Sequence, residues 1–217
     1  MLIAHLIPMA RTLIVVATLL LIAVAASGLD AEDAEALALP FDPQIISRLS
    51  LDGKPRSLAI RQGTDTWLGY DLERATALKA WQAPAGKPGL LKSGFVTRST
   101  GTTFFEDSTD ATWELQRGER IAPVTVRYLG CSQQKDRIEL SWELQHDTGT
   151  LKLLERIPLA AAPAGVKVVR EVRVEALAAE ESLLLPSAAR KAWKLSTDQK
   201  APATALTGTE WHRLTLP

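Results

Sequence analysis

The sequence predicts an all-β protein: a two-layer antiparallel β-sandwich, supersandwich-like, preceded by an N-terminal signal helix. Three observations predict this class. From about Ile45 onward, short apolar alternations are interrupted by Gly, Pro, Asp and Ser about every 8 to 12 residues, as in sandwiches and barrels. Strand-like segments greatly outnumber helical ones. No repeat of about 20 to 50 residues appears, which disfavours a propeller or solenoid. Two stacked layers bury such alternating faces most simply.

Length, charge and cysteine content narrow the class further. The chain has 217 residues, with 25 Lys and Arg against 25 Asp and Glu. About 190 residues remain without an export segment, enough for one domain that buries about 70% of its surface without a metal or disulfide. Zero net charge gives no overall field for a polyanion, so we expect no nucleic-acid partner. The single Cys131 excludes an internal disulfide and a C-x-x-C-H haem attachment, and we expect no cofactor and no metal.

The N-terminal sequence is typical of an export signal. Arg11 precedes an apolar run from Leu13 to Ala26, and small residues follow in an A-x-A-like pattern. We predict a signal peptide at residues 1–27, cleaved after Ala25 or Ser27, and a periplasmic or secreted protein. The alternative is an uncleaved anchor, but about 14 apolar residues fall short of the roughly 20 that span a bilayer. Contact with a membrane is expected only through such a retained segment.

Two further segments complete the predicted organisation. Residues 28–44 are a linker or short helix, because Leu29–Leu39 is acidic and alanine-rich with helical propensity. Residues 45–217 form the β-sandwich domain.

The clearest strand is Arg137–Gln145, in which Ile138, Leu140, Trp142 and Leu144 alternate with polar residues. The turn His146–Gly149 predicts a hairpin with a four-residue loop and a second strand at Thr150–Ile157. In this register Leu144 faces Leu151 and Trp142 faces Leu153.

The same register places Glu155 opposite Leu140 on the apolar face. We expect a bulge there, or a position at the rim of the sheet where Arg137 and Arg156 solvate or pair the acid. A buried acid with a raised pKa would be a site candidate.

Other segments are predicted by the same pattern. Val166–Val174 carries Arg170 on its valine face. Asp71–Ala80 suits a helix by composition, but its boundaries favour a strand. The remaining strands are predicted at Ser57–Arg61, Thr66–Tyr70, Thr112–Gln116, Val124–Gly130 and Trp211–Leu216, and loops at Gln82–Pro88, Leu159–Gly165 and Ser196–Gly208.

No motif for catalysis is present. His146 is expected in a turn and His212 at a rim, and no G-x-S-x-G supplies a nucleophile. The segment Glu106–Asp110 resembles an oxygen-rich calcium turn but lacks the D-x-D-x-D-G spacing. We therefore predict no catalytic residues.

Six tryptophans offer possible sugar-stacking surfaces. Trp81 precedes a Pro/Gly loop and is the best candidate for exposure, although core packing is the commoner role. The candidate ligand-binding residues are Trp81, Arg98 and Glu155, provided that they converge on one concavity.

From Arg56 to about Ile157 the chain resembles a β-sandwich module of exported planctomycete and verrucomicrobial proteins, often found beside c-type cytochrome or sugar-dehydrogenase-like domains. The resemblance lies in the order and spacing of short features: Arg56–Ile60, Tyr70–Asp71, Arg74, Ala80–Trp81, Gly94–Phe95, Pro123–Val124, Val126–Gly130 and the closing hairpin. The family commonly has a W-x-G-G-F-like step, whereas here an inserted loop separates Trp81 from Phe95.

The resemblance implies a non-catalytic accessory or binding role, with a carbohydrate or a partner protein of a periplasmic redox or sugar-oxidation system as the ligand. Two alternatives stay open: a mutarotase-like or lyase-like enzyme, and a structural protein of the cell envelope.

Overall fold

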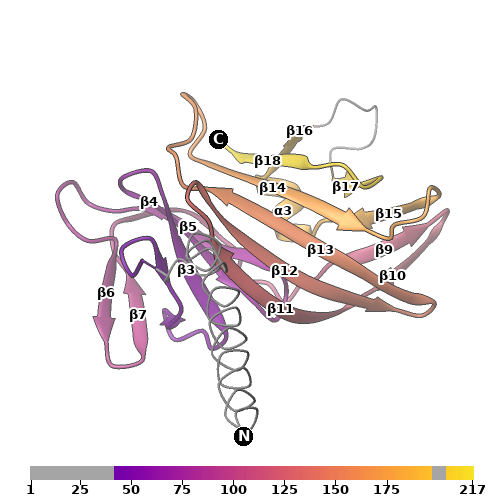
Figure 1. Cartoon of the computed structure of the whole chain (residues 1–217), viewed down its shortest axis with the longest axis horizontal. Helices are drawn as coiled ribbons and strands as arrows, with labels where there is room; N and C mark the ends of the chain where they lie inside the picture. Colours follow the sequence, from indigo (N-terminus) through magenta and orange to yellow (C-terminus); the bar gives the residue numbers. More distant parts are fainter. Residues whose placement is uncertain (1–41, 197–203) are drawn as a thin grey trace, which may run out of the picture. The chain divides into compact units, whose positions relative to one another are not determined.

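In the part of the chain that the structure describes, residues 42–196 and 204–217 of a computed structural model, the regular structure is almost all β-strand (Figure 1). This confirms the all-β class. The predicted signal peptide and the predicted linker up to residue 41 lie outside the described residues. Within residues 42–196 and 204–217, no helix is long and apolar enough to cross a membrane.

One layer of the sandwich is a six-stranded antiparallel sheet. Its strands, in spatial order, are β11 (Thr125–Gln133), β12 (Arg137–His146), β13 (Gly149–Pro158), β14 (Val168–Glu175), β18 (His212–Leu216) and β16 (Lys194–Ser196). The predicted register of β12 and β13 is confirmed, because Leu144 pairs with Leu151 and Trp142 with Leu153. The loop is shorter than predicted: His146 pairs with Gly149, so only two residues remain between the strands.

Two sheets share the opposite layer. The five-stranded sheet contains β1 (Ile46–Ser47), β3 (Ser57–Gln62), β4 (Thr66–Asp71), β5 (Thr76–Gln82) and β8 (Thr102–Glu106). The four-stranded sheet contains β10 (Arg120–Pro123), β9 (Glu114–Arg117), β15 (Glu181–Leu184) and β17 (Ala205–Leu206). Both sheets bury apolar residues in one cluster with the six-stranded sheet. The predicted β-sandwich is thereby confirmed, with its main core between these two layers.

Two local predictions need correction. The predicted strand Asp71–Ala80 is a turn followed by β5, which begins at Thr76. The predicted surface connection Ser196–Gly208 contains β17, whose Ala205 and Leu206 are buried and pair with β15. A short helix, α3 (Ser187–Ala192), follows β15 and packs Ala189 into the core.

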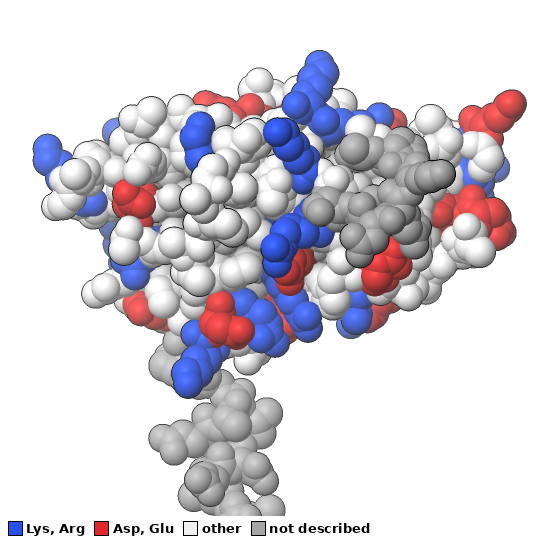
Figure 2. All heavy atoms as spheres, turned by 90° about the horizontal axis from the view of Figure 1, so that it is seen from above, with Lys and Arg blue, Asp and Glu red and all other residues white. Residues whose placement is uncertain are grey.

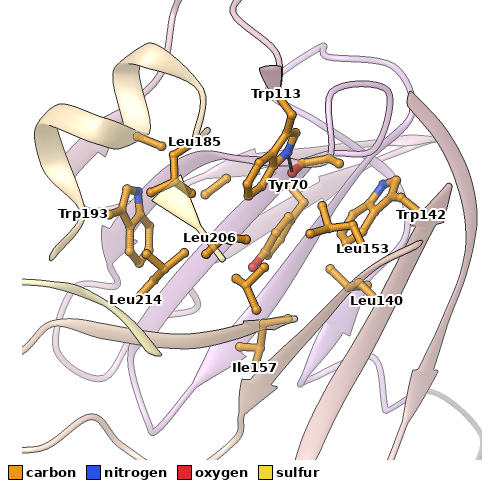
Figure 3. Packing of buried hydrophobic residues seen from close by; sticks show 14 of the residues in the cluster. Tyr70, Trp113, Leu140, Trp142, Leu153, Ile157, Leu185, Trp193, Leu206 and Leu214 are labelled. Carbon is orange, nitrogen blue, oxygen red and sulfur yellow. Dashed lines mark hydrogen bonds between the residues drawn. The ribbon is translucent and has the colours of Figure 1, made fainter. Parts of the chain in front are cut away.

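The main core contains the large aromatic side chains of Tyr70, Trp113, Trp142 and Trp193 (Figure 3), and two of these indoles also form hydrogen bonds to backbone carbonyls. The indole N–H of Trp113 donates to the carbonyl of Ala75 at 2.9 Å, and that of Trp142 donates to the carbonyl of Leu72 at 3.1 Å. Both carbonyls belong to the turn between β4 and β5, where Ala75 has a φ of 52°. Burying a large apolar side chain contributes about 1.5–3 kcal/mol, so these indoles both fill the core and hold the turn.

A small third layer covers the other face of the five-stranded sheet. It consists of β2 (Ser50–Leu51), β7 (Val96–Ser99) and β6 (Leu90–Ser93), with β2 and β7 parallel. The residues that point this way form a second buried cluster: Leu51, Ala59, Trp67, Trp81 and Ala83. The five-stranded sheet is therefore apolar on both faces.

Gln62 joins the two main layers. Its amide nitrogen donates to the carbonyls of Pro158 and Val169, each at 2.8 Å, and its amide oxygen accepts from the Val169 N–H at 2.9 Å. The side chain is 1% exposed. One residue at the end of β3 thus satisfies backbone groups of both β13 and β14.

We expect Gln62→Leu to lower the free energy of unfolding by about 2–4 kcal/mol, because three hydrogen bonds are lost and buried backbone groups are left without partners. Urea unfolding followed by tryptophan fluorescence measures the change. Gln82→Leu is the matched control: Gln82 is exposed and donates only to Asp65, so a change within about 0.5 kcal/mol is expected. Equal losses in the two variants would contradict the role assigned to Gln62.

Candidate functional site

The structure does not bring the three sequence-predicted site residues together. Trp81 is fully buried on the outer face of the five-stranded sheet, which confirms the favoured core-packing role. Glu155 belongs to β13 of the six-stranded sheet and is fully buried between the two main layers, in contact with Tyr70. Arg98 is exposed on β7. The predicted common concavity is therefore absent for these residues.

Glu155 lies in a buried polar cluster, and the expected rim position is wrong. Its carboxylate accepts hydrogen bonds from the Tyr70 hydroxyl at 2.6 Å and from Arg170 at 3.0 Å. The register of β12 and β13 runs through Leu140 and Glu155 without the predicted bulge. Arg170 replaces Arg137 and Arg156 as the partner because it lies on the core face of the next strand, β14.

Electrostatics in this cluster follow from burial. Burial raises the pKa of Glu155, while Arg170 and the Tyr70 hydroxyl act in the opposite direction. Burial and the neighbouring Glu155 raise the pKa of Tyr70 well above its usual value, so the phenol stays protonated and donates. The Arg170 guanidinium also lies 4.4 Å from the ring centre of Trp193. All three ionisable side chains are sealed from solvent, so the cluster links the two layers and presents no group to a substrate.

The two histidines of the described chain are held by protein groups. His146 Nδ1 lies 2.8 Å from an Arg117 nitrogen, and Arg117 also pairs with Asp147 and Glu181. His212 is 3% exposed, and its Nε2 lies 2.9 Å from the carbonyl of Thr207. The expected rim position of His212 is wrong, because the ring points into the fold.

In the segment Glu106–Asp110, which resembles a calcium-binding turn, the positive charge beside Asp107 is the guanidinium of Arg74. Asp107 is buried, and its carboxylate accepts from the backbone and hydroxyl of Thr109 at 2.9 and 2.7 Å and from Arg74 at 3.2 Å. Arg74 also donates to Asp71 at 2.7 Å. In residues 42–196 and 204–217, no group of three or more His, Cys, Asp or Glu is arranged to hold a metal ion.

A row of large side chains crosses the outer face of the five-stranded sheet. Arg61 on β3 pairs with Trp67 on β4, which pairs with Trp81 on β5. The two indoles are stacked, with ring centres 6.1 Å apart and planes 11° apart. The Trp81 N–H donates to the carbonyl of Gly89 at 2.8 Å, so the loop before β6 is tied down over this row.

A pocket of about 330 Å³ opens beside Trp67, at the arginine end of the row. We call it the Trp67 pocket. Its lining residues are Pro43, Gln44, Arg61, Thr64, Trp67, Ala83, Lys87, Pro88, Gly89 and Leu90. Gly89 is required there, because an added Cβ would lie 2.1 Å from the Trp67 indole nitrogen. Neither Arg61 nor Lys87 forms an ion pair with another described residue.

The pocket uses residues that the sequence did not single out. Trp67 lies on a predicted strand, and its neighbour Arg61 ends another. A signal was present, because Arg61 and Trp67 lie at the two sides of a tight turn, where hairpin pairing places them on one face. Gln44 and Lys87 come from distant segments, and no local pattern predicts that they meet.

These features define an all-β sandwich with a polar and aromatic pocket on the outer face of one sheet. The chain matches no protein-family model, and comparisons with curated proteins and with solved structures found no significant match. The resemblance to the planctomycete and verrucomicrobial module stays a prediction.

We expect Glu155→Gln to lower the free energy of unfolding by about 3–5 kcal/mol, because Arg170 would keep a buried charge without its counter-ion. The double variant Glu155→Leu with Arg170→Met removes both charges and should recover most of that loss. Chemical denaturation measures both. A double variant that is less stable than Glu155→Gln would contradict this account.

The lowered pKa of Asp71 makes the stability of the fold depend on pH. Burial alone would raise the pKa of Asp71, but hydrogen bonds from Arg74 and Lys54 outweigh it and hold the pKa below its ordinary value of 3.8. A lowered folded-state pKa gives stability that is present above pH 3.8 and lost as the pH falls through the folded value.

In Asp71→Asn we therefore expect a smaller free energy of unfolding at pH 7, by about 1–3 kcal/mol, and a flatter decline below pH 4. Thermal unfolding between pH 7 and pH 2.5 measures this difference. Parallel pH profiles for the two proteins would contradict it.

Proposed function

We propose that the chain is an exported, non-catalytic binding module whose ligand is a carbohydrate, held in the Trp67 pocket. The observation that carries the proposal is the pairing of an indole with two cations that have no ion-pair partner in the described chain, Arg61 and Lys87. Trp67 is 6% exposed and stacked on Trp81, so only a small part of the indole borders the pocket and can contact the C–H groups of a sugar ring. The polar side chains offer donors to its hydroxyl or carboxylate groups.

The dimensions and chemistry of the pocket suit a small sugar unit. A volume of about 330 Å³ lies at the lower end of the range for small-molecule sites. Gln44 and Thr64 can each donate and accept hydrogen bonds. Arg61 and Lys87 favour a sugar that carries a carboxylate, because an arginine fork matches that group. A uronate residue is therefore the preferred ligand class.

The lining of the pocket supports binding over acid–base catalysis. Its ten residues include no Asp, Glu or His, whereas a mutarotase-like or lyase-like reaction needs a group that exchanges a proton near the operating pH. The buried acid Glu155 belongs to the other main layer and contacts Tyr70 on the core side of the five-stranded sheet, away from the pocket.

A glycan array that includes neutral sugars and uronates tests the proposal. We expect binding of uronate-containing glycans, with affinity reduced about tenfold or more in Arg61→Ala, because one charge-assisted hydrogen bond contributes about 1.5–3 kcal/mol. Gln44→Ala should weaken binding less.

Lys135→Ala is the matched control, because Lys135 is an exposed lysine in the turn between β11 and β12 and does not line the pocket. Absence of any bound glycan, or a bound glycan that is equally sensitive to Lys135→Ala and Arg61→Ala, would overturn the proposal.

A further inference from the structure

The hairpin of β6 and β7 carries the most exposed large apolar side chain of the described chain. Phe95 is 88% exposed and Leu91 is 55% exposed. Figure 1 shows this hairpin extending beside the five-stranded sheet, with its turn at a free end. Ser93 pairs with Val96, so only Gly94 and Phe95 form the turn, and Gly94 has a φ of 60°. Glycine at the first central position is typical of a type II′ turn, which holds Phe95 at the tip.

Strand pairing separates the two faces of this hairpin. Thr97 is buried against the body, where its hydroxyl donates to the carbonyl of Ser50. Leu90 packs against the Trp67 and Trp81 cluster. Leu91 pairs with Arg98 on the opposite face, so both point away from the body. The outward face therefore combines Leu91, Arg98 and the tip residue Phe95.

The charged side chains of the hairpin itself are all basic, and the carboxylate of Asp52, which accepts from Ser99 of β7, is paired with Lys79. Between Arg74 and Glu106 the sequence contains no acidic residue, although the whole chain is neutral. Lys92 and Arg98 are exposed and form no ion pair with another described residue, and the adjacent loop contributes Lys87. Elsewhere basic and acidic side chains are interspersed, as on the face in Figure 2. The hairpin is thus a cationic projection with an aromatic tip.

We propose that this hairpin docks on an anionic lipid surface and inserts Phe95 at the level of the headgroups. Aromatic residues favour this interfacial zone, and basic residues beside them are attracted to anionic headgroups. The shape favours a bilayer over a protein, because a stable protein interface buries about 800 Å² on each partner. A narrow turn with two large exposed apolar side chains offers a bilayer an insertion point but gives a protein little flat area.

A fluorescent probe at the tip tests the proposal locally. The full-length chain carries Phe95→Cys with Cys131→Ser and is labelled with the environment-sensitive dye NBD. Vesicles contain phosphatidylcholine alone, or phosphatidylcholine with 30% phosphatidylglycerol. We expect a blue shift of the emission, and quenching by brominated lipid, with the anionic vesicles and a much smaller response with the neutral ones. High salt should weaken the response.

The matched control places the dye at Ile121, a residue of β10 that is 52% exposed. Because the readout is local, the apolar N-terminal run contributes equally to both labelled proteins. A response at residue 95 but not at residue 121 supports the proposal. Equal responses at the two positions would overturn it. So would an unshifted probe at residue 95 with both vesicles, the result expected if the hairpin instead served an acidic protein.

Charge reversal gives a second test. Each basic residue near an anionic surface changes the affinity about fivefold, so Lys92→Glu with Arg98→Glu should weaken vesicle binding at least 25-fold. Lys135→Glu with Lys191→Glu changes the net charge equally at exposed positions away from the hairpin and should weaken binding less than threefold. Equal losses in the two double variants would show attraction by net charge alone and would overturn the docking role of the hairpin.

Discussion

Burial of both faces of the five-stranded sheet is the constraint on which the remaining architecture depends. Leu58, Ile60, Leu68 and Tyr70 point into the main core, while their neighbours along the same strands form the smaller cluster around Trp67 and Trp81. A sheet with one polar, solvent-exposed face needs no further layer on that face. Here the second apolar face requires the small layer of β2, β6 and β7. That layer supplies one wall of the Trp67 pocket and the exposed hairpin.

Polar groups between the layers serve a different purpose from the apolar core. Gln62 satisfies backbone atoms of two strands, and Tyr70 reaches across to the Glu155 and Arg170 pair. A buried ion pair adds little net stability, since desolvation opposes its attraction. Its geometry is nevertheless demanding, because a slip of one residue in β13 or β14 would turn a charge toward apolar side chains. These groups therefore favour one register of the layers over its neighbours.

The predictable parts of the fold were those with local signals. The period-two alternation of β12 and the turn after it sufficed to predict that Leu144 pairs with Leu151 and Trp142 with Leu153, whereas the two-residue turn and the unbroken register through Glu155 were not predicted. The partners of Glu155 were not predictable from local sequence. Arg170 reaches it only because β14 pairs with β13, and Tyr70 lies on a strand 85 residues earlier in the sequence. The segment Leu90–Ser93 lacks apolar alternation, so β6 was read as part of an inserted loop. The pocket was missed for a similar reason, since Gln44 and Lys87 meet only through tertiary packing.

The hydrogen bond from Trp81 to Gly89 has a consequence for communication within the molecule. Pro88, Gly89 and Leu90 line the Trp67 pocket, and Leu90 is also the first residue of β6. A movement of Pro88 or Gly89 at the pocket would therefore also move the first residue of β6. The hydrogen bond from the Trp81 indole limits the positions that this stretch can take. If a ligand occupies the Trp67 pocket as proposed, its contact with this stretch would link binding to ordering of the strand pair, and such linkage is reciprocal. The stretch from Pro88 to Leu90 would thus couple the pocket to the hairpin of the small outer layer.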